Sequence, residues 1–177
     1  MRDHTRRKVL IQIASVGGVA LTGGTASAAA VCQRTISDIE GPFYIPSAPL
    51  RNNLALYGDK GTPLLMEGRV FNASCTEVVG GAAIEFWQAN PMGVYDNNSS
   101  EMRYRCKLTT DPKGRYSLRT LLPGLYLNGS SYRPRHIHMK IYDPFGKERL
   151  TTQLYFRGDP HLKGDPFGHP SLVMDFS

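Results

Sequence analysis

The sequence predicts an all-β protein, an antiparallel β-sandwich with little helix, and three observations lead to this expectation. After residue 30 there is no long apolar repeat with a period of 3.6 residues. Short runs of apolar and β-branched residues alternate with turn signals instead. The 18 glycines and 12 prolines among 177 residues are high for a helix bundle and normal for a turn-rich β protein.

The expected strands follow one another in pairs, and each pair flanks a turn rich in Gly, Pro or Asp, as in a β-hairpin. The pairs are 67–72 with 82–89, 103–109 with 116–121, and 136–142 with 150–156. A last strand is expected at 172–176. Three hairpin-like units in succession are typical of a β-sandwich, and about 147 residues are enough for one core.

The first thirty residues form a separate segment. They open with Arg2, Arg6, Arg7 and Lys8, continue through a short apolar run at 9–21, and end on small residues at 25–30. These are the three parts of a secretory signal, and the apolar run is too short for a membrane helix of about 20 residues. The stretch 5–10, Thr-Arg-Arg-Lys-Val-Leu, resembles a twin-arginine export signal.

We therefore expect residues 1–30 to be removed after Ala28 or Ala30, and 31–177 to be exported to the periplasm or the extracellular space as a single domain. The alternative is an amphipathic N-terminal arm that stays attached.

The net charge of +6 suggests at first a nucleic-acid or membrane-surface binder. Removal of the leader leaves 17 basic and 14 acidic residues, a modest +3. The basic residues of the expected strands alternate with other residues, which is typical of a solvated sheet face, and no nucleic-acid motif accompanies them. They are Arg103, Arg105, Lys107, Arg115 and Arg119. We expect no nucleic-acid partner and no stable membrane anchor.

His136 and His138 are the first candidate metal ligands. Residues two apart on a strand point to the same face, so the two imidazoles can converge on one ion, although an exposed surface pair is the common alternative. Tyr95 and Tyr126 stand where strands are expected to end. A phenolate is a hard anionic donor that suits a strong Lewis acid such as ferric iron, whereas core packing is the ordinary role of a tyrosine.

Five segments in order resemble the motifs of the intradiol ring-cleavage dioxygenases, which open catechol rings with non-haem Fe(III) and O₂. The likeness is greatest to the protocatechuate 3,4-dioxygenase branch. The segments are 40–44 (EGPFY), 87–95 (WQAN running to Tyr95), 120–126 (TLLPGLY), 133–138 (RPRHIH) and 150–159 (LTTQLYF, then Gly-Asp).

The resemblance implies the intradiol dioxygenase type of β-sandwich and a role for each matching residue. Fe(III) would be held by Tyr95, Tyr126, His136 and His138. The substrate pocket would be lined by Gly41, Pro42, Phe43 and Tyr44. The catalytic residues would be Arg133, Gln153 and Tyr126, with Arg133 stabilising negative charge that develops on the ring.

By the same resemblance, the reaction joins a small aromatic diol with O₂ and breaks the bond between the two hydroxyl-bearing carbons, which gives a cis,cis-muconate-type diacid. A homo-oligomer and a related partner subunit both remain open. The alternative function is a secreted β-sandwich binding module that kept the fold without catalysis. The presence of all four ligand positions argues against it.

The three cysteines would enter an oxidising compartment after export, where one bridge and one free thiol are possible. The resemblance puts Gly41–Tyr44 at the site end of the sandwich and the turn near Cys75 at the other end. Cys32 precedes Gly41 by about nine residues, enough chain to reach the far end. Cys32–Cys75 is the favoured pairing, and Cys106 would then be free.

Overall fold

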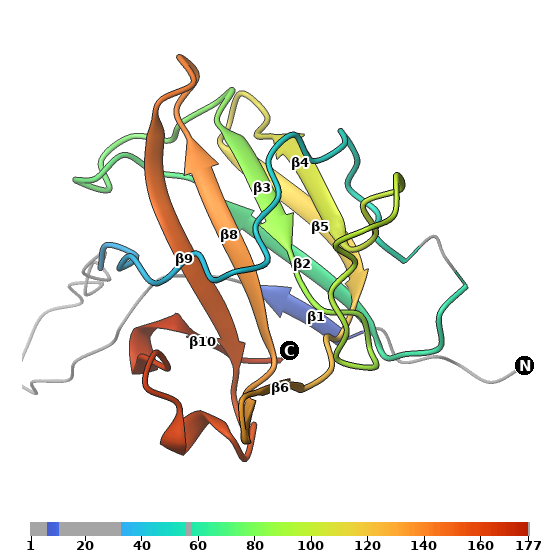
Figure 1. Cartoon of the computed structure of the whole chain (residues 1–177). Helices are drawn as coiled ribbons and strands as arrows, with labels where there is room; N and C mark the ends of the chain where they lie inside the picture. Colours follow the sequence, from blue (N-terminus) through green and yellow to red (C-terminus); the bar gives the residue numbers. More distant parts are fainter. Residues whose placement is uncertain (1–6, 11–32, 56–57, 177) are drawn as a thin grey trace, which may run out of the picture.

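The computed structural model describes residues 7–10, 33–55 and 58–176, and its strands form two main sheets and a small hairpin (Figure 1). The three-stranded sheet has the order β1-β2-β5, and the five-stranded sheet has the order β10-β9-β8-β3-β4. The first contains β1 (Arg7–Leu10), β2 (Pro63–Arg69) and β5 (Arg115–Leu121). The second contains β3 (Ala83–Trp87), β4 (Arg105–Thr109), β8 (His136–Tyr142), β9 (Glu148–Phe156) and β10 (Val173–Met174).

Helix is sparse, as expected. The described chain has two 3₁₀ turns, η1 (Leu162–Gly164) and η2 (Pro170–Leu172), and its small hairpin pairs β6 (Tyr126–Asn128) with β7 (Ser131–Arg133). The predicted all-β class is therefore confirmed. No helix in the described ranges has the length and apolar character needed to cross a membrane.

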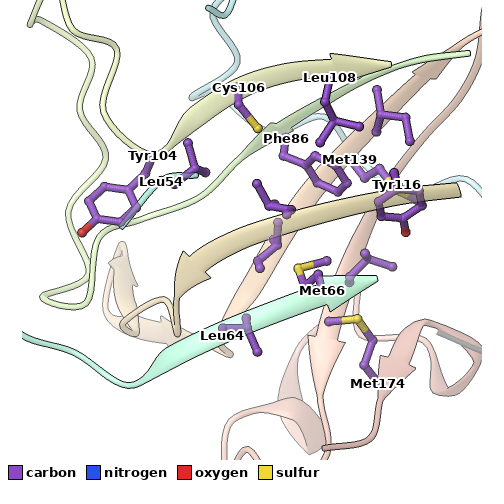
Figure 2. Close-up of a cluster of buried hydrophobic side chains, with 14 of the residues drawn as sticks. Leu54, Leu64, Met66, Phe86, Tyr104, Cys106, Leu108, Tyr116, Met139 and Met174 are labelled. Atoms are coloured by element: carbon purple, nitrogen blue, oxygen red, sulfur yellow. The ribbon is translucent and has the colours of Figure 1, made fainter. Parts of the chain in front are cut away.

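The core lies between the two main sheets and is built by strand alternation (Figure 2). Leu64 and Met66 of β2 and Leu118 of β5 face Phe86 of β3 and Met139 of β8. The intervening residues of β3 and β8 point to the opposite face of the five-stranded sheet. That second face, which we call the outer face, carries the predicted histidine ligands of β8.

Two of the three predicted hairpins are wrong. β2 pairs with β5, and β3 pairs with β4 and β8, so the chain changes sheet between β2 and β3 and again between β4 and β5. Only β8 and β9 form the predicted hairpin. A turn signal shows where a strand ends, but it does not show with which strand that strand will pair. An arrangement in which the chain passes from one sheet to the other lets both sheets bury an apolar face.

The crossing segment, residues 33–51, covers the outer face (Figure 1). It starts at the free edge of β9, where Asp38 N donates to Thr151 O at 2.9 Å. It ends beside β4, where Arg51 N donates to Lys107 O at 3.1 Å. Between these edges Gln153 donates to Ile39 O at 3.2 Å. Its backbone is thus fixed over the sheet by hydrogen bonds.

The cysteines behave as the favoured pairing requires. Cys75 is disulfide-bonded, and Cys106 is a free thiol buried in the core. A Cys75–Cys106 bridge is therefore excluded. Cys32, the expected partner, lies outside the described residues.

The strand β1 belongs to the predicted leader. It pairs in parallel with β2 over four residues, from Arg7 opposite Leu64 to Leu10 opposite Glu67. Most of residues 1–30 lie outside the described ranges, so the division at residue 30 stays a prediction. Removal of the leader would expose the backbone edge of β2.

We expect Leu118→Ala to lower the free energy of unfolding by about 2–5 kcal/mol, because it leaves a cavity between the sheets where the side chain is 0% exposed. Urea denaturation measures the loss. Leu50→Ala is the matched control, since Leu50 is 79% exposed and its truncation should cost under about 0.5 kcal/mol. Equal losses in the two variants would contradict this assignment of the core.

Candidate active site

The histidine pair lies on the outer face of β8. His136 and His138 are buried there, while Ile137 and Met139 between and beyond them belong to the core. Strand register places Tyr155 and Gln153 of β9 directly opposite the two histidines. The alternation of β8 therefore presents both imidazoles to one space beside Gln153.

Tyr95 and Tyr126 reach the same space from two loops whose backbones touch. Gly93 has φ +81°, and a Cβ atom there would lie 1.9 Å from Leu125 O. A Cβ atom on Gly124 would lie 2.4 Å from Gly93 N. Asn90 joins the loops, since its carbonyl accepts from both Gly93 N and Gly124 N at 2.9 Å. Two glycines are thus needed for the tyrosine-bearing segments to meet.

The four rings converge. The ring centroids of His136 and His138 are 4.8 Å apart, those of Tyr95 and Tyr126 are 5.5 Å apart, and those of Tyr126 and His136 are 5.6 Å apart. The phenolic oxygen of Tyr95 lies 3.3 Å from His136 Nε2. Residues from β8, β6 and the loop after β3 are thereby brought into one cluster.

Both imidazoles are in the state that a metal ligand requires. His136 Nδ1 lies 2.7 Å from Pro134 O, and because a carbonyl only accepts, Nδ1 carries the proton and Nε2 is left with its lone pair. Burial lowers the pKa of His136 to about 4. Burial, followed by the neighbouring His136, lowers the pKa of His138 well below its usual value, so this imidazole is also neutral.

The phenol of Tyr95 is hard to ionise. Burial, followed by the nearby Tyr126, raises the pKa of Tyr95, and the charges of Arg133 and Arg105 oppose this only in part. Such a phenol loses its proton near neutral pH only beside a strong Lewis acid. No three His, Cys, Asp or Glu side chains are grouped to hold a metal in the ranges that the structure covers, so an ion here would depend on the tyrosine oxygens.

The donor set of two phenols and two neutral imidazoles fits a hard, highly charged cation, and ferric iron is such a cation.

The predicted pocket residues lie in the crossing segment. A Cβ atom on Gly41 would be 3.2 Å from His138 Cε1, so the backbone passes directly against this ring. Phe43 stacks on Tyr95 with centroids 4.3 Å apart and meets Tyr126 edge-on at 5.5 Å. Tyr44 packs behind these rings, donating to Glu85 Oε2 at 2.7 Å, and Pro42 is exposed. Gly41 and Phe43 contact the ring cluster directly, and Tyr44 packs on Trp87 with ring centroids 4.9 Å apart.

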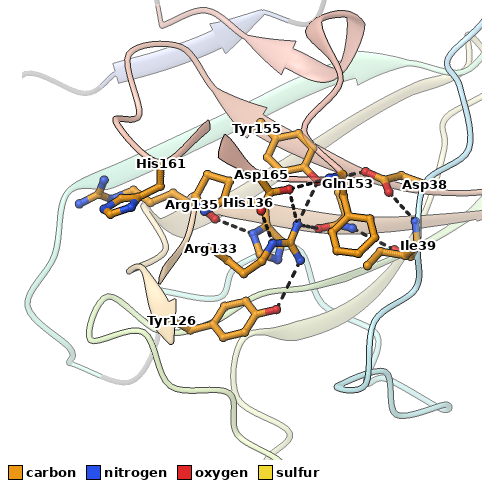
Figure 3. A network of polar contacts seen from close by, with 12 residues as sticks. Asp38, Ile39, Tyr126, Arg133, Arg135, His136, Gln153, Tyr155, His161 and Asp165 are labelled. Atoms are coloured by element: carbon orange, nitrogen blue, oxygen red, sulfur yellow. Dashed lines mark hydrogen bonds and ion pairs between the residues drawn. The ribbon is translucent and has the colours of Figure 1, made fainter. Parts of the chain in front are cut away.

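Arg133 and Gln153 are buried beside the cluster in a polar network (Figure 3). Arg133 Nη1 lies 3.4 Å from the Tyr126 phenolic oxygen, and Nη2 donates to Gln153 Oε1 at 3.1 Å. Three members of the network were not expected from the sequence: Asp38, Tyr155 and Asp165. The two-residue alternation from Gln153 would have placed Tyr155 on this face, whereas no local pattern marks Asp165.

Arg105 corrects one expectation. Its side chain was predicted to lie on a solvated sheet face, yet the residue is 1% exposed. It donates to Phe43 O at 2.6 Å and to Asp96 O at 3.0–3.1 Å, and so links the crossing segment to the loop that carries Tyr95. Arg105 does alternate with the core residues Cys106 and Tyr104, but the face of β4 to which it points is covered by other segments.

Known dioxygenases resemble this chain in sequence and in fold. A family model described as "Dioxygenase" matches residues 39–174. The chain is 34% identical over 147 residues to catechol 1,2-dioxygenase 2 of Acinetobacter lwoffii, covering 72% of this chain and 53% of the relative. It is 35% identical over 130 residues to the protocatechuate 3,4-dioxygenase beta chain of Burkholderia cepacia, covering 65% and 54%. The chain thus spans about half the length of these relatives.

Among solved structures, the dioxygenase domain of a dioxygenase carbohydrate-binding protein fusion from Streptomyces sp. SirexAA-E superposes with a TM-score of 0.72 and 34% identity. That match covers 81% of this chain and 94% of the other. Catechol 1,2-dioxygenase from Pseudomonas arvilla C-1 superposes with a TM-score of 0.70 and 31% identity, covering 78% of this chain and 52% of the other.

We expect Gly93→Ala to displace the Tyr95 loop from the segment before Tyr126. Gly146→Ala is the matched control, because Gly146 also has positive φ, at +84°, but nothing lies within 4 Å of an added Cβ atom. Both variants carry backbone strain of about 1 kcal/mol. Gly93→Ala adds a clash and should cost about 2 kcal/mol more in urea denaturation and alter the near-ultraviolet circular dichroism. Indistinguishable variants would contradict the close approach of the loops.

Proposed function

The chain belongs to the intradiol ring-cleavage dioxygenase family, and on that basis we propose that it is a ferric-iron enzyme that opens a catechol-type ring with O₂. The bond between the two hydroxyl-bearing carbons breaks, both atoms of O₂ enter the product, and a cis,cis-muconate-type diacid results. No further oxidant or reductant is needed, since the diol supplies the electrons that O₂ accepts.

One observation carries the proposal: Tyr95, Tyr126, His136 and His138 converge in a buried space beside Arg133. These four residues would hold the iron of the site. When bound, ferric iron supplies a Lewis acid that withdraws electrons from the diol and makes its ring reactive toward O₂.

The residues around the iron ligands have separable tasks. Tyr126, as a proposed phenolate ligand, would accept a proton from the diol, and Arg133 Nη1 lies 3.4 Å from the same oxygen. Arg133 and Gln153 provide polar groups beside the space where the ring's negative charge would develop. Phe43 closes the side of Tyr95 and excludes water there.

The substrate belongs to the class of small aromatic diols. The relatives are named for catechol, chlorocatechol, protocatechuate and hydroxyquinol, and the class common to these names is a ring with two adjacent hydroxyls. We propose no particular ring substituent.

The reaction is tested by adding catechol, protocatechuate and hydroxyquinol separately to the ferric protein without oxygen, and then admitting O₂. We expect at least one to yield a diacid with both ¹⁸O atoms of labelled O₂ at early times. A product cleaved outside the two hydroxyls would contradict intradiol chemistry. A colourless protein that takes up no iron would favour the non-catalytic binding module, the alternative that the family match disfavours.

Loss of one proposed iron ligand should change the colour of the protein and lower its turnover. We expect Tyr126→Phe to shift or remove the tyrosinate-to-iron absorption band and to reduce kcat by at least about 10²-fold. Tyr132→Phe is the matched control, because Tyr132 lies six residues away on β7 and is 53% exposed. Equal activity of the two variants would exclude Tyr126 from the mechanism.

We further propose that the protein is exported and that residues 1–30 are removed on export. The support is the three-part leader and its paired arginines, Arg6 and Arg7. Cell fractionation followed by intact-mass measurement should find a chain that begins near residue 29 or 31 in the exported fraction. Replacement of both arginines by lysine should leave the full-length chain inside the cell. A full-length chain in the exported fraction would refute cleavage.

A further inference from the structure

The strongest contact of Arg133 comes from the C-terminal segment. Asp165 follows η1, and its carboxylate receives the Nε and Nη2 edge of the guanidinium, with Nη2 and Oδ1 3.1 Å apart (Figure 3). The Arg133 and Asp165 side chains are only 6% and 2% exposed. A bidentate pair of this kind fixes the plane of the guanidinium, not only its charge.

Most N–H donors of the Arg133 guanidinium bind protein groups, and one is left for a molecule in the active site. Nε is taken by Asp165. Nη2 faces three acceptors, which are Asp165 at 3.1 Å, Gln153 at 3.1 Å and the Tyr155 hydroxyl at 3.2 Å. In the covered part of the chain, Nη1 has a single acceptor, the Tyr126 oxygen at 3.4 Å. Since Nη1 has two hydrogens, one remains for a molecule bound at the site.

Asp165 is itself held in place. Its Oδ1 accepts from Phe167 N at 3.0 Å, which closes the turn after η1. The Phe167 ring covers the guanidinium, with Cζ of Arg133 4.8 Å from the ring centroid. On the other side Tyr155, which accepts from Nη2, is fixed by Asp38 at 3.0 Å. The Asp165 carboxylate is therefore fixed in position, and it can hold the Arg133 guanidinium in one orientation as well as balance its charge.

We propose that Asp165 is a positioning residue that orients Arg133 so that its Nη1 edge faces the reacting ring. The proposal rests on the proposed function, and it identifies the C-terminal segment as part of the active site. Loss of Asp165 leaves Arg133 free to rotate among Gln153, Tyr155 and the site, which misplaces the one donor that the ring can use.

The first measurement uses the iron-free protein and does not depend on turnover. In ¹⁵N-labelled protein the Arg133 Nε–H resonance, assigned by its loss in Arg133→Lys, should exchange slowly with solvent. Asp165→Asn should accelerate this exchange at least about tenfold, because an amide is a weaker and uncharged acceptor. Asp175→Asn is the matched control, since Asp175 pairs with Arg157 where both side chains are about two-thirds exposed (66% and 65%).

The second measurement uses the ferric protein and the substrate that the wild type cleaves. Asp165→Asn should reduce kcat about 10²-fold while KM changes less than about threefold, because the misplaced donor acts on charge that develops during the reaction. Asp165→Glu keeps the charge but moves the carboxylate by one methylene, so its kcat should lie between those of Asp165→Asn and the wild type. Asp175→Asn should match the wild type.

Two results would overturn the proposal: an unchanged Nε–H exchange rate in Asp165→Asn, or a kcat equal to that of the wild type in both Asp165 variants. If Asp165→Asn does not fold, Asp165→Glu decides by the same criteria. If the wild-type protein cleaves no diol, the proposed function fails, and the exchange measurement alone decides whether Asp165 fixes Arg133.

Discussion

Strand β8 is the constraint on which the rest of the molecule depends. Its alternate side chains point to opposite faces, so Ile137 and Met139 build the core while His136 and His138 build the site. A shift of the register by one residue would bury imidazoles between the sheets and move core residues to the outer face. Stability and chemistry therefore select the same register, which pairs with β3 on one side and β9 on the other.

The site is polar yet buried, and this is possible because its charges have partners on the covered outer face. Lys140 lies two residues beyond His138 and is paired with Glu40 of the crossing segment. Arg133 is paired with Asp165, and Arg105 donates to backbone carbonyls of two loops. Removal of Asp165 would leave the buried Arg133 guanidinium without its counter-ion, which costs more than the loss of a surface pair. The same contacts that cover the site therefore also define its shape.

Features that depend on local residue spacing could be predicted from the sequence, whereas features that depend on contacts between distant segments could not. The all-β class followed from turn signals, and the two-residue spacing of His136 and His138 put them on one face. The hairpin between β2 and β3 was predicted wrongly because turn residues do not specify a partner strand. Arg105 and Asp165 were missed because each acquires its role from a segment far away in the chain: Phe43 for the first and Arg133 for the second.

The crossing segment also has a consequence for how the domain folds. Several of its contacts join residues that are 100 to 117 positions apart, such as Glu40 with Lys140 and Asp38 with Tyr155. Closure of such long loops is costly in chain entropy and slows folding. The environment of the four proposed metal ligands thus forms only when nearly the whole domain has assembled. A metal that binds the folded site and not the unfolded chain would therefore bind only after the domain has folded completely. No fragment of the chain contains all the segments that surround the site.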